Sequence, residues 1–336
     1  MKRSFVVAVA CLLLLLGLAA YGGPKQEAES EAGPVVLKLA HVYNPGHIWD
    51  KGANLAAEQV AAKTNGQVKI EIFPASQLGT EEQITEGVVF GSIDVCVSGA
   101  GQIGNLFKPI NVLEMPYVFK DLDHVLRFAE SDIAKEMFAD LEEEFNIKVI
   151  GTSSFGVRHV LSVGKPVVTP DDLKGFKLRV PQQQVTVAYG KAMGAEPTPI
   201  AYAEAYLALQ QNVVDGLENP LSAIENMRFY EVGKYINLTG HVINTTFFIM
   251  NGPKFASLSK TQQTAVMEAF SQASTFIVDE LKKADEDLVS FFQGKGLQIV
   301  QSDMSAFQQK TAEMPASFSK WWIRYGADLH KRIQGM

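Results

Sequence analysis

The stretch of residues 35–73, VVLKLAHVYNPGHIWDKGANLAAEQVAAKTNGQVKIEIF, decides the fold class. Its first eight residues, 35–42, are mainly apolar and predict a strand. Small apolar residues then recur at helical spacing over 53–60, and the triplet Thr64-Asn65-Gly66 predicts the end of that helix. Apolar and charged residues alternate over 68–72, which is typical of a strand with one wetter face. Strand, helix and strand in this order predict an α/β fold.

The same alternation continues along the chain. Thr80 and Gln83 form a capping box that predicts a helix start, and the alternating apolar residues of 93–97 predict the next strand. The later predicted elements are a helix over 125–145, a strand over 148–153, a capped helical turn at 169–172, a strand over 177–180, helices near 185–193 and 203–211, a strand over 241–250, and helices over 259–292 and 305–333. We therefore expect a mainly parallel sheet covered by helices.

Length and composition exclude several classes of protein. The chain has 336 residues, which is enough for two domains. Its 47% hydrophobic and 20% charged residues fit neither a disordered chain nor a polytopic membrane protein. The net charge is -7, from 30 Lys and Arg against 37 Asp and Glu, so the chain offers no basic field for a phosphate backbone. We expect no nucleic-acid partner.

The N-terminus predicts export. Lys2 and Arg3 precede an apolar run over 5–20, and the chain then turns polar, which is the order of a secretory signal. We predict a signal peptide over 1–22 and a flexible tether over 23–34, with a single membrane anchor as the alternative for a run this short. Tyr21 stands where a lipoprotein signal carries its lipid-bearing cysteine, which argues against lipidation. The exported chain keeps Cys96 alone and forms no internal disulfide.

The sequence also argues against cofactor and metal chemistry. Residues 99–104 match G-x-G-x-x-G after a strand, but Pro109 and Pro116 leave little room for the helix that a dinucleotide site needs. G-x-S-x-G, H-E-x-x-H and paired C-x-x-C motifs are absent from the sequence, and its six histidines are scattered. We expect no cofactor, no metal and no catalytic residues, although metal ligands assembled from distant loops stay an alternative.

Two arginines are placed as anion receptors. Arg179 lies at the end of a predicted strand and Arg158 follows another, and ligands bind beyond the carboxyl ends of strands in open α/β sheets. A guanidinium grips a carboxylate through two parallel hydrogen bonds. Asn219 precedes a proline, which favours extended backbone and can aim its amide into a cleft. Tyr202 is a candidate aromatic wall. A surface or salt-bridged arginine, a plain turn and a core tyrosine are the alternatives for these residues.

Several ordered motifs resemble those of the solute-binding proteins of tripartite ATP-independent periplasmic (TRAP) transporters, the DctP type. They are PASQLG at 74–79, GSID at 91–94, DLKGFKLRVP at 172–181, GAEPTP at 194–199, AYLALQ at 205–210 and VDGLENP at 214–220. The resemblance covers nearly everything from Val35 to the C-terminal helices. It implies a two-lobed periplasmic binding protein fold with mainly parallel sheets, crossing strands and long C-terminal helices. Lobe I is expected to comprise 35–156 and about 245–284, and lobe II 157–244 and about 285–336.

The resemblance also implies a role for individual residues. Arg179 matches the arginine that pairs with the ligand carboxylate, Arg158 matches a second arginine that assists it, and Asn219 matches an asparagine that holds the same carboxylate. Tyr202 matches an aromatic that packs on the ligand, and His241 matches a histidine that supports this network.

Three further residues are expected to set specificity from the first lobe. Glu81, or its neighbour Glu82, is placed to reach ligand hydroxyls, whereas Asn44 and His47 lie in the loop after the first strand. The branch that binds sialic acid carries an acidic residue after the third strand, where this chain has Ser98, Gly99 and Ala100, so sialic acid is not the expected ligand.

The function implied is capture of a small organic acid in the cleft between the lobes and its delivery to a TRAP permease driven by an ion gradient. The protein is expected to be periplasmic and monomeric, and not an enzyme. A sugar acid such as a uronate or an aldonate is the expected ligand, with a C4-dicarboxylate as the alternative. An exported α/β enzyme acting on an acidic substrate, and a signalling or structural surface protein, are the alternatives from other classes.

Overall fold

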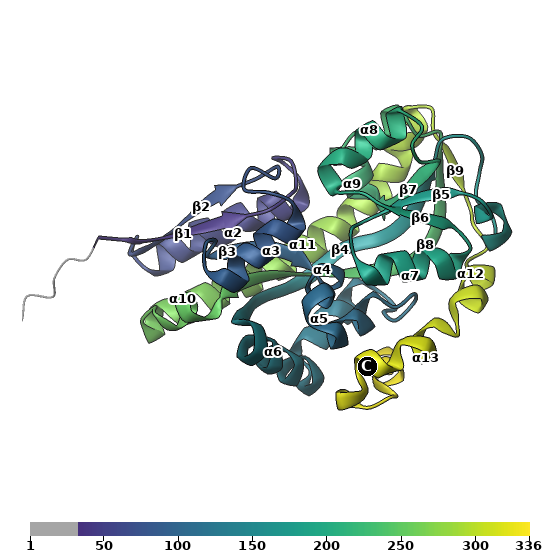
Figure 1. Ribbon diagram of the computed structural model, residues 1–336. Helices are drawn as coiled ribbons and strands as arrows, with labels where there is room; N and C mark the ends of the chain where they lie inside the picture. The colour runs from purple at the N-terminus through teal and green to yellow at the C-terminus, as the bar shows by residue number, and fades with distance from the viewer. Residues whose placement is uncertain (1–32) are drawn as a thin grey trace, which may run out of the picture. The chain divides into compact units, whose positions relative to one another are not determined.

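The computed structural model describes residues 33–336, and residues 35–336 form one compact unit (Figure 1). The predicted signal peptide and all but the last two residues of the predicted tether lie outside the described residues. The strands are β1 (Val35–Ala40), β2 (Val68–Phe73), β3 (Val95–Gly99), β4 (Ile147–Ser162), β5 (Lys177–Val180), β6 (Glu196–Pro199), β7 (Gly216–Pro220), β8 (Tyr235–Asn251) and β9 (Gln298–Val300). They form a single sheet in the order β2-β1-β3-β8-β4-β7-β5-β6, with β9 paired to β8.

The sheet is parallel at its two ends and antiparallel in its middle. β1 runs parallel to β2 and β3 at one end, and β5 runs parallel to β6 and β7 at the other. Between them β8 is antiparallel to β3 and β4, and β4 is antiparallel to β7. β4 and β8 have 16 and 17 residues and join the two parallel ends. The expected α/β class and the expected crossing strands are confirmed.

Helices cover the sheet, as expected from the alternation. Their bounds are α2 (Ile48–Lys63), α3 (Glu81–Phe90), α4 (Ala100–Leu106), α5 (Leu122–Glu130), α6 (Asp132–Phe145), α7 (Gln184–Met193), α8 (Ala205–Gln210), α9 (Leu221–Asn226), α10 (Gly252–Ala256), α11 (Lys260–Gly294), α12 (Met304–Thr311), α13 (Met314–Phe318) and α14 (Leu329–Gln334). The 3₁₀ turns η1 (Lys108–Glu114), η2 (Pro170–Leu173) and η3 (Tyr202–Glu204) complete the elements near the cavity described below.

The long predicted helix bridges the two ends of the sheet. α11 has 35 residues, about 52 Å at 1.5 Å per residue. It contacts α2 on one side of the molecule and α9 and β9 on the other (Figure 1). The C-terminal chain also returns across the molecule, because α12 packs on α7 while α14 packs on η1. Arg324 in this returning tail bonds Glu144 on α6 at 2.6 Å.

Three local predictions differ from the structure. The helix expected over 125–145 is two helices, because Ser131 ends α5 and accepts the Ala134 N–H as the N-cap of α6. The segment around Asn219, for which a plain turn was the alternative, is strand β7, since pairing with β4 and β5 overrides its turn residues. A short helix, α4, does follow Gly99.

The position of Arg158 also differs from the sequence-based interpretation. It lies inside β4, which extends to Ser162, rather than after the end of a strand. Register shifts interrupt β4 on both sides of Arg158, at Ser154/Gly156 and at Arg158/Val160. Gly156 has φ 119°, and a Cβ there would lie 2.9 Å from Pro220. Such bulges bend a strand and change where its side chains point, and this one lies two residues before Arg158.

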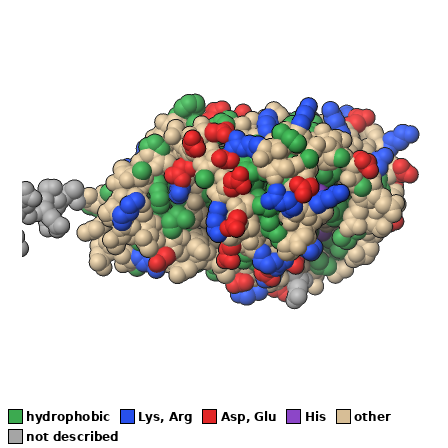
Figure 2. Space-filling view, turned by 90° about the horizontal axis from the view of Figure 1, so that it is seen from below, with side chains coloured by type: hydrophobic (Ala, Val, Ile, Leu, Met, Phe, Trp, Pro, Cys, Tyr) green, Lys and Arg blue, Asp and Glu red, His purple; other side chains and the backbone are tan. Residues whose placement is uncertain are grey.

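The surface carries charges of both signs. Lysine and arginine side chains are interspersed with aspartate and glutamate over the face that Figure 2 shows. Among residues 33–336, no helix is long and apolar enough to cross a membrane. Cys96, in β3, is buried.

Candidate ligand-binding site

A cavity of about 110 Å³ lies where the two ends of the sheet face each other. Its walls come from α3, α4 and η1 on one side and from β5, η3 and β7 on the other, with β4 and β8 between them. The lining residues used below are Tyr43, Glu81, Gln102, Glu114, Phe155, Arg158, Arg179, Gln183, Tyr189, Tyr202, Asn219 and Asn244. Five of the eight residues predicted from the sequence are on this wall, namely Glu81, Arg158, Arg179, Tyr202 and Asn219.

Arg179 is a buried cation that lacks a carboxylate partner within the described chain. It is the third residue of β5 and is 1% exposed. Its Nε and Nη2 donate to the carbonyl oxygen of Ile200 at 3.0 and 2.6 Å, while Nη1 has no partner in the part of the chain that the structure describes. Burial lowers the pKa of Arg179 to about 10, so the side chain is still charged at neutral pH. A buried charge without a counter-ion is costly, so this site favours an anion from outside the chain.

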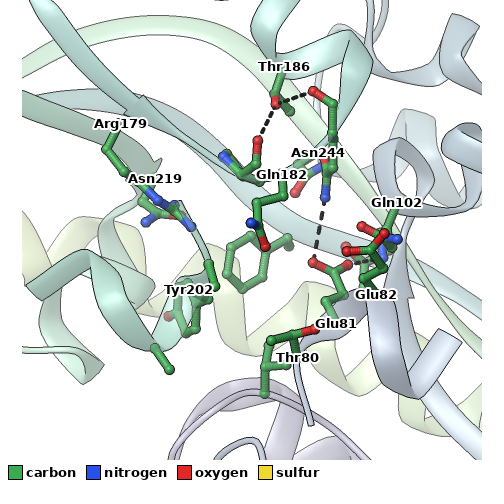
Figure 3. A pocket seen from close by; sticks show the side chains of 18 of the residues that line it. Thr80, Glu81, Glu82, Gln102, Arg179, Gln182, Thr186, Tyr202, Asn219 and Asn244 are labelled. Atoms are coloured by element: carbon green, nitrogen blue, oxygen red, sulfur yellow. Dashed lines mark hydrogen bonds between the residues drawn. The ribbon is translucent and has the colours of Figure 1, made fainter. Parts of the chain in front are cut away.

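Two more donors without partners lie beside Arg179. The Nδ2 of Asn219 and the hydroxyl of Tyr202 are buried and have no hydrogen-bond partner among residues 33–336. Figure 3 shows Arg179, Asn219 and Tyr202 together at one side of the pocket, with Glu81, Glu82 and Gln102 at the other. Three donors without acceptors at one pole match a carboxylate, which offers only acceptors. We refer to Arg179, Asn219 and Tyr202 as the donor pole.

Arg158 is already paired, in contrast to Arg179. Its Nε and Nη2 donate to the two carboxylate oxygens of Glu218, and Nη2 also reaches the Asn219 Oδ1 at 3.2 Å. Although burial alone would lower it, the Glu218 carboxylate raises the pKa of Arg158 above its usual value. Burial would raise the pKa of Glu218, but Arg158 and His241 hold it at about 2. Arg158 and Glu218 therefore form an ionised pair that fixes the Asn219 amide.

The opposite side of the cavity is rich in carboxyl and amide groups. Glu81, the first residue of α3, accepts the Gly99 N–H at 2.8 Å and lies 3.5 Å from the Gln183 Nε2. Burial raises the pKa of Glu81. Such groups both donate to and accept from hydroxyls, so this side is suited to the polyhydroxyl part of a ligand.

Three predicted residues lie off the cavity wall, and their part in binding stays a prediction. His241 is behind Glu218, with its Nε2 3.4 Å from Glu218 Oε2 and its Nδ1 2.8 Å from Thr239 Oγ1. His47 caps α2 by accepting the Trp49 N–H, and its ring stacks on Tyr43 at 4.7 Å. Burial lowers the pKa of His47 to about 3, which keeps the ring neutral.

The third of these residues, Asn44, faces another part of the protein. Its Nδ2 lies 3.5 Å from the Asn226 carbonyl oxygen and 3.4 Å from the Met227 sulfur. Asn44 therefore links the loop after β1 to the end of α9 rather than pointing into the cavity.

The glycines at 99–104 serve close packing. A Cβ on Gly101 would lie 2.2 Å from the Gln183 Oε1, and one on Gly104 would lie 2.1 Å from the Asn111 Oδ1. At the N-terminus of α4 the Gly99 N–H is taken by the Glu81 carboxylate. An acidic side chain thus occupies the place where a dinucleotide phosphate would bind. The motif lets α4 approach the neighbouring chain closely.

Three consecutive glutamines, Gln182, Gln183 and Gln184, connect the two sides of the cavity at its rim. The contacts from this segment across to α3, α4 and η1 are Asn105 Nδ2 to Gln182 O at 3.2 Å, Gln184 N to Asn105 Oδ1 at 3.1 Å, Lys108 Nζ to Gln184 Oε1 at 2.7 Å and Gln183 Nε2 to Glu81 Oε2 at 3.5 Å. These bonds link the two sides of the cavity across its rim.

The family model for DctP, described as bacterial extracellular solute-binding protein, family 7, matches residues 39–320. The chain belongs to this family. The sialic acid-binding periplasmic protein of Vibrio cholerae is 31% identical over 282 residues, which are 84% of this chain and 88% of that protein. A TRAP periplasmic solute-binding protein of Roseobacter denitrificans, solved with bound L-galactonate, is 30% identical with a TM-score of 0.81 and covers 85% of this chain and 94% of its own. A second TRAP periplasmic solute-binding protein of Roseobacter denitrificans, solved with bound β-D-glucuronate, is 26% identical with a TM-score of 0.83. The match covers 90% of this chain and 99% of that one.

The chain is accordingly a TRAP solute-binding protein with the two-lobed fold of these relatives. Sequence reasoning on the DctP resemblance missed two buried acids of its site, Glu218 and Glu114. Glu218 directly precedes Asn219 in the VDGLENP motif, and an acid beside a residue expected at the site is the signal that could have found it. Glu114 lies in a mainly apolar 3₁₀ turn, and nothing local in the sequence places it at the cavity.

Proposed function

We propose that this TRAP solute-binding protein captures a sugar acid with one carboxylate, an aldonate or a uronate, and presents it to the membrane permease. The observation that carries the proposal is the donor pole, where the buried Arg179 has no carboxylate partner within the described chain. A carboxylate placed against Arg179, Asn219 and Tyr202 satisfies all three. Because Arg179 is buried, those charge-assisted bonds are stronger than they are at a surface.

The charge inventory favours one carboxylate over two. The cavity wall carries two arginines, and Arg158 is neutralised by Glu218. Only Arg179 is left on this wall to balance a ligand charge. A second ligand carboxylate would meet no free cation there, so a C4-dicarboxylate is disfavoured.

The rest of the cavity supports a hydroxylated chain. Gln102, Gln183, Glu81 and Asn244 offer donors and acceptors beyond the donor pole, and Phe155 and Tyr43 supply an apolar wall. Relatives of this chain were solved with L-galactonate and with β-D-glucuronate, which are an aldonate and a uronate. The same class of ligand is proposed here.

The remaining parts of the proposal concern the molecule as a whole. Lobe I is taken as 35–156 with about 245–284, and lobe II as 157–244 with about 285–336, so that β4 and β8 connect them. Export is proposed to use the signal peptide over 1–22. The protein is proposed to act as a monomer and to release its acid unchanged, which separates it from an exported enzyme.

Isothermal titration calorimetry on residues 35–336 tests this proposal. The panel contains L-galactonate, D-glucuronate, succinate, N-acetylneuraminate and the neutral sugar galactose. We expect one sugar-acid class to bind with a Kd at least 100-fold below that of succinate, and galactose not to bind. Tighter binding of succinate, or equal binding of galactose, contradicts the proposal. Mass spectrometry of the acid recovered after overnight incubation gives an unchanged mass if the protein is a carrier and a changed one if it is an enzyme.

A further inference from the structure

The cavity holds a second buried acid, Glu114, whose environment differs from that of Glu218. Glu114 is the last residue of η1, is 1% exposed, and lies on the same wall as Arg158 and Asn244. None of the functions argued above uses it. A carboxyl group at this depth is either paired with a cation or neutral.

The bonds of Glu114 come from amides. The Nδ2 of Asn244 donates to its two carboxyl oxygens at 2.6 and 2.7 Å, and the Thr245 N–H donates to Oε1 at 3.3 Å. Throughout residues 33–336, no lysine, arginine or histidine forms an ion pair with it. Arg158 is near, but its Nε and Nη2 are taken by Glu218 and its Nη1 donates to the Asn244 oxygen at 3.2 Å.

The charged and titratable groups that face Glu114 are few. They are Arg158 from β4, Glu218 from β7 and Tyr189 from α7, with His241 of β8 behind Glu218. Burial and the Glu218 carboxylate raise the pKa of Glu114 to about 8, against the opposing effect of Arg158. The group is therefore mainly protonated at neutral pH, and a protonated carboxyl group carries one O–H that can donate a hydrogen bond.

We propose that Glu114 is a specificity-determining residue that, as a neutral carboxylic acid, donates a hydrogen bond to an oxygen of the bound acid away from its carboxylate. The inference rests on the proposed function, since it needs an anionic polyhydroxyl ligand in this cavity. It assigns Glu114 two tasks. The neutral acid donates a hydrogen bond to a hydroxyl or carbonyl oxygen of the ligand. The carboxylate formed at high pH repels the anionic ligand in the same cavity.

The consequence is a dependence of affinity on pH. If the ionised form does not bind, the competent fraction falls from about 0.9 at pH 7 to about 0.1 at pH 9, so the apparent Kd rises about tenfold. Sugar acids are ionised over this whole range, and Arg179, with its pKa of about 10, stays mainly charged. Burial also raises the pKa of Glu81 on the same wall, so the effect of Glu114 has to be separated from that of Glu81 by variants of each.

Calorimetric titration with L-galactonate or D-glucuronate between pH 6 and 9 tests the inference. For the unaltered protein we expect the Kd at pH 9 to be about ten times that at pH 7. In Glu114→Gln, which carries a permanent neutral donor, this ratio should fall to about one, whatever its absolute affinity. Glu81→Gln is the matched control, because Glu81 lines the same cavity, and it should keep the tenfold ratio. A flat profile in the unaltered protein, or a ratio abolished by Glu81→Gln instead, overturns the inference.

A second measurement needs no variant. At pH 8.5, binding should take up about 0.8 proton per ligand, seen as a difference in binding enthalpy between buffers of different ionisation enthalpy. No uptake, or proton release, overturns the inference even if Glu114→Gln fails to fold. Failure of every sugar acid to bind at any pH refutes the proposed function itself, whereas tight binding with a flat profile refutes only the role of Glu114.

Discussion

Replacing Arg179 with lysine removes the planar fork and keeps the charge. In the structure Nε and Nη2 are anchored on the Ile200 carbonyl, which leaves Nη1 and the second Nη2 hydrogen for the ligand. A lysine ammonium cannot hold the carbonyl and also donate two parallel bonds to a carboxylate. The variant therefore loses about one charge-assisted hydrogen bond, worth about 1.5–3 kcal/mol, which corresponds to roughly a 10- to 100-fold weaker Kd.

Calorimetry and thermal unfolding measure this effect together. At 100 times the Kd of the unaltered protein, ligand stabilises it by about 2.7 kcal/mol, whereas a variant with 100-fold weaker affinity gains only about 0.4 kcal/mol at the same concentration. Arg127→Lys is the control, because Arg127 is an exposed helix residue with its Nη2 3.7 Å from Asp121. A folded Arg179→Lys protein that binds within threefold of the unaltered one refutes the reasoning about the donor pole.

Three further results are expected from the same site. Asn219→Asp places a negative charge at the donor pole and should weaken sugar-acid binding at least roughly 100-fold, measured by calorimetry. Asn219→Ser loses only a donor and should weaken the same binding roughly tenfold. Equal losses of affinity in the two variants contradict this prediction. Folding raises the pKa of Glu114 from 4.5 to about 8, so its ionisation opposes folding at neutral and alkaline pH. In a pH series of thermal unfolding, the ligand-free stability of Glu114→Gln relative to the unaltered protein should therefore rise by about 3 kcal/mol between pH 4 and pH 7. A relative stability that falls over this range contradicts the account. Gly101→Ala should displace the Gln183 amide and weaken binding up to about tenfold, whereas Gly164→Ala, with no atom within 4 Å of the added Cβ, should not; equal affinities in the two variants contradict the close packing at α4.

Much of the fold was predictable because its signals are local. The capping box at Thr80, the strand over 177–180 and the long C-terminal helix are encoded by adjacent residues, and each is present as predicted. One kind of miss arises where pairing with a distant strand decides the local structure. β7 contains turn-forming residues yet is a buried strand, because β4 pairs along one of its edges and β5 along the other.

The same distinction holds for the site. Arg179 was found because it ends a short strand within a recognisable motif. The ion pair of Arg158 with Glu218 was not predictable, because Glu218 is 60 residues away in the sequence. The two side chains meet only through the pairing of β4 with β7. His47 and Asn44 were expected at the cavity because they follow the first strand, but their side chains cap α2 and contact α9 instead.

The central claim is that a ligand carboxylate neutralises Arg179 at the donor pole. A crystal structure of residues 35–336 with the tightest-binding sugar acid tests it most directly. We predict one carboxylate oxygen within hydrogen-bond distance of Arg179 Nη1, the other at Asn219 Nδ2 or the Tyr202 hydroxyl, and the hydroxyl chain directed toward Glu81 and Glu114. A ligand whose carboxylate lies at the Glu81 side, or one bound outside the cavity with Arg179 still unpaired, contradicts the account.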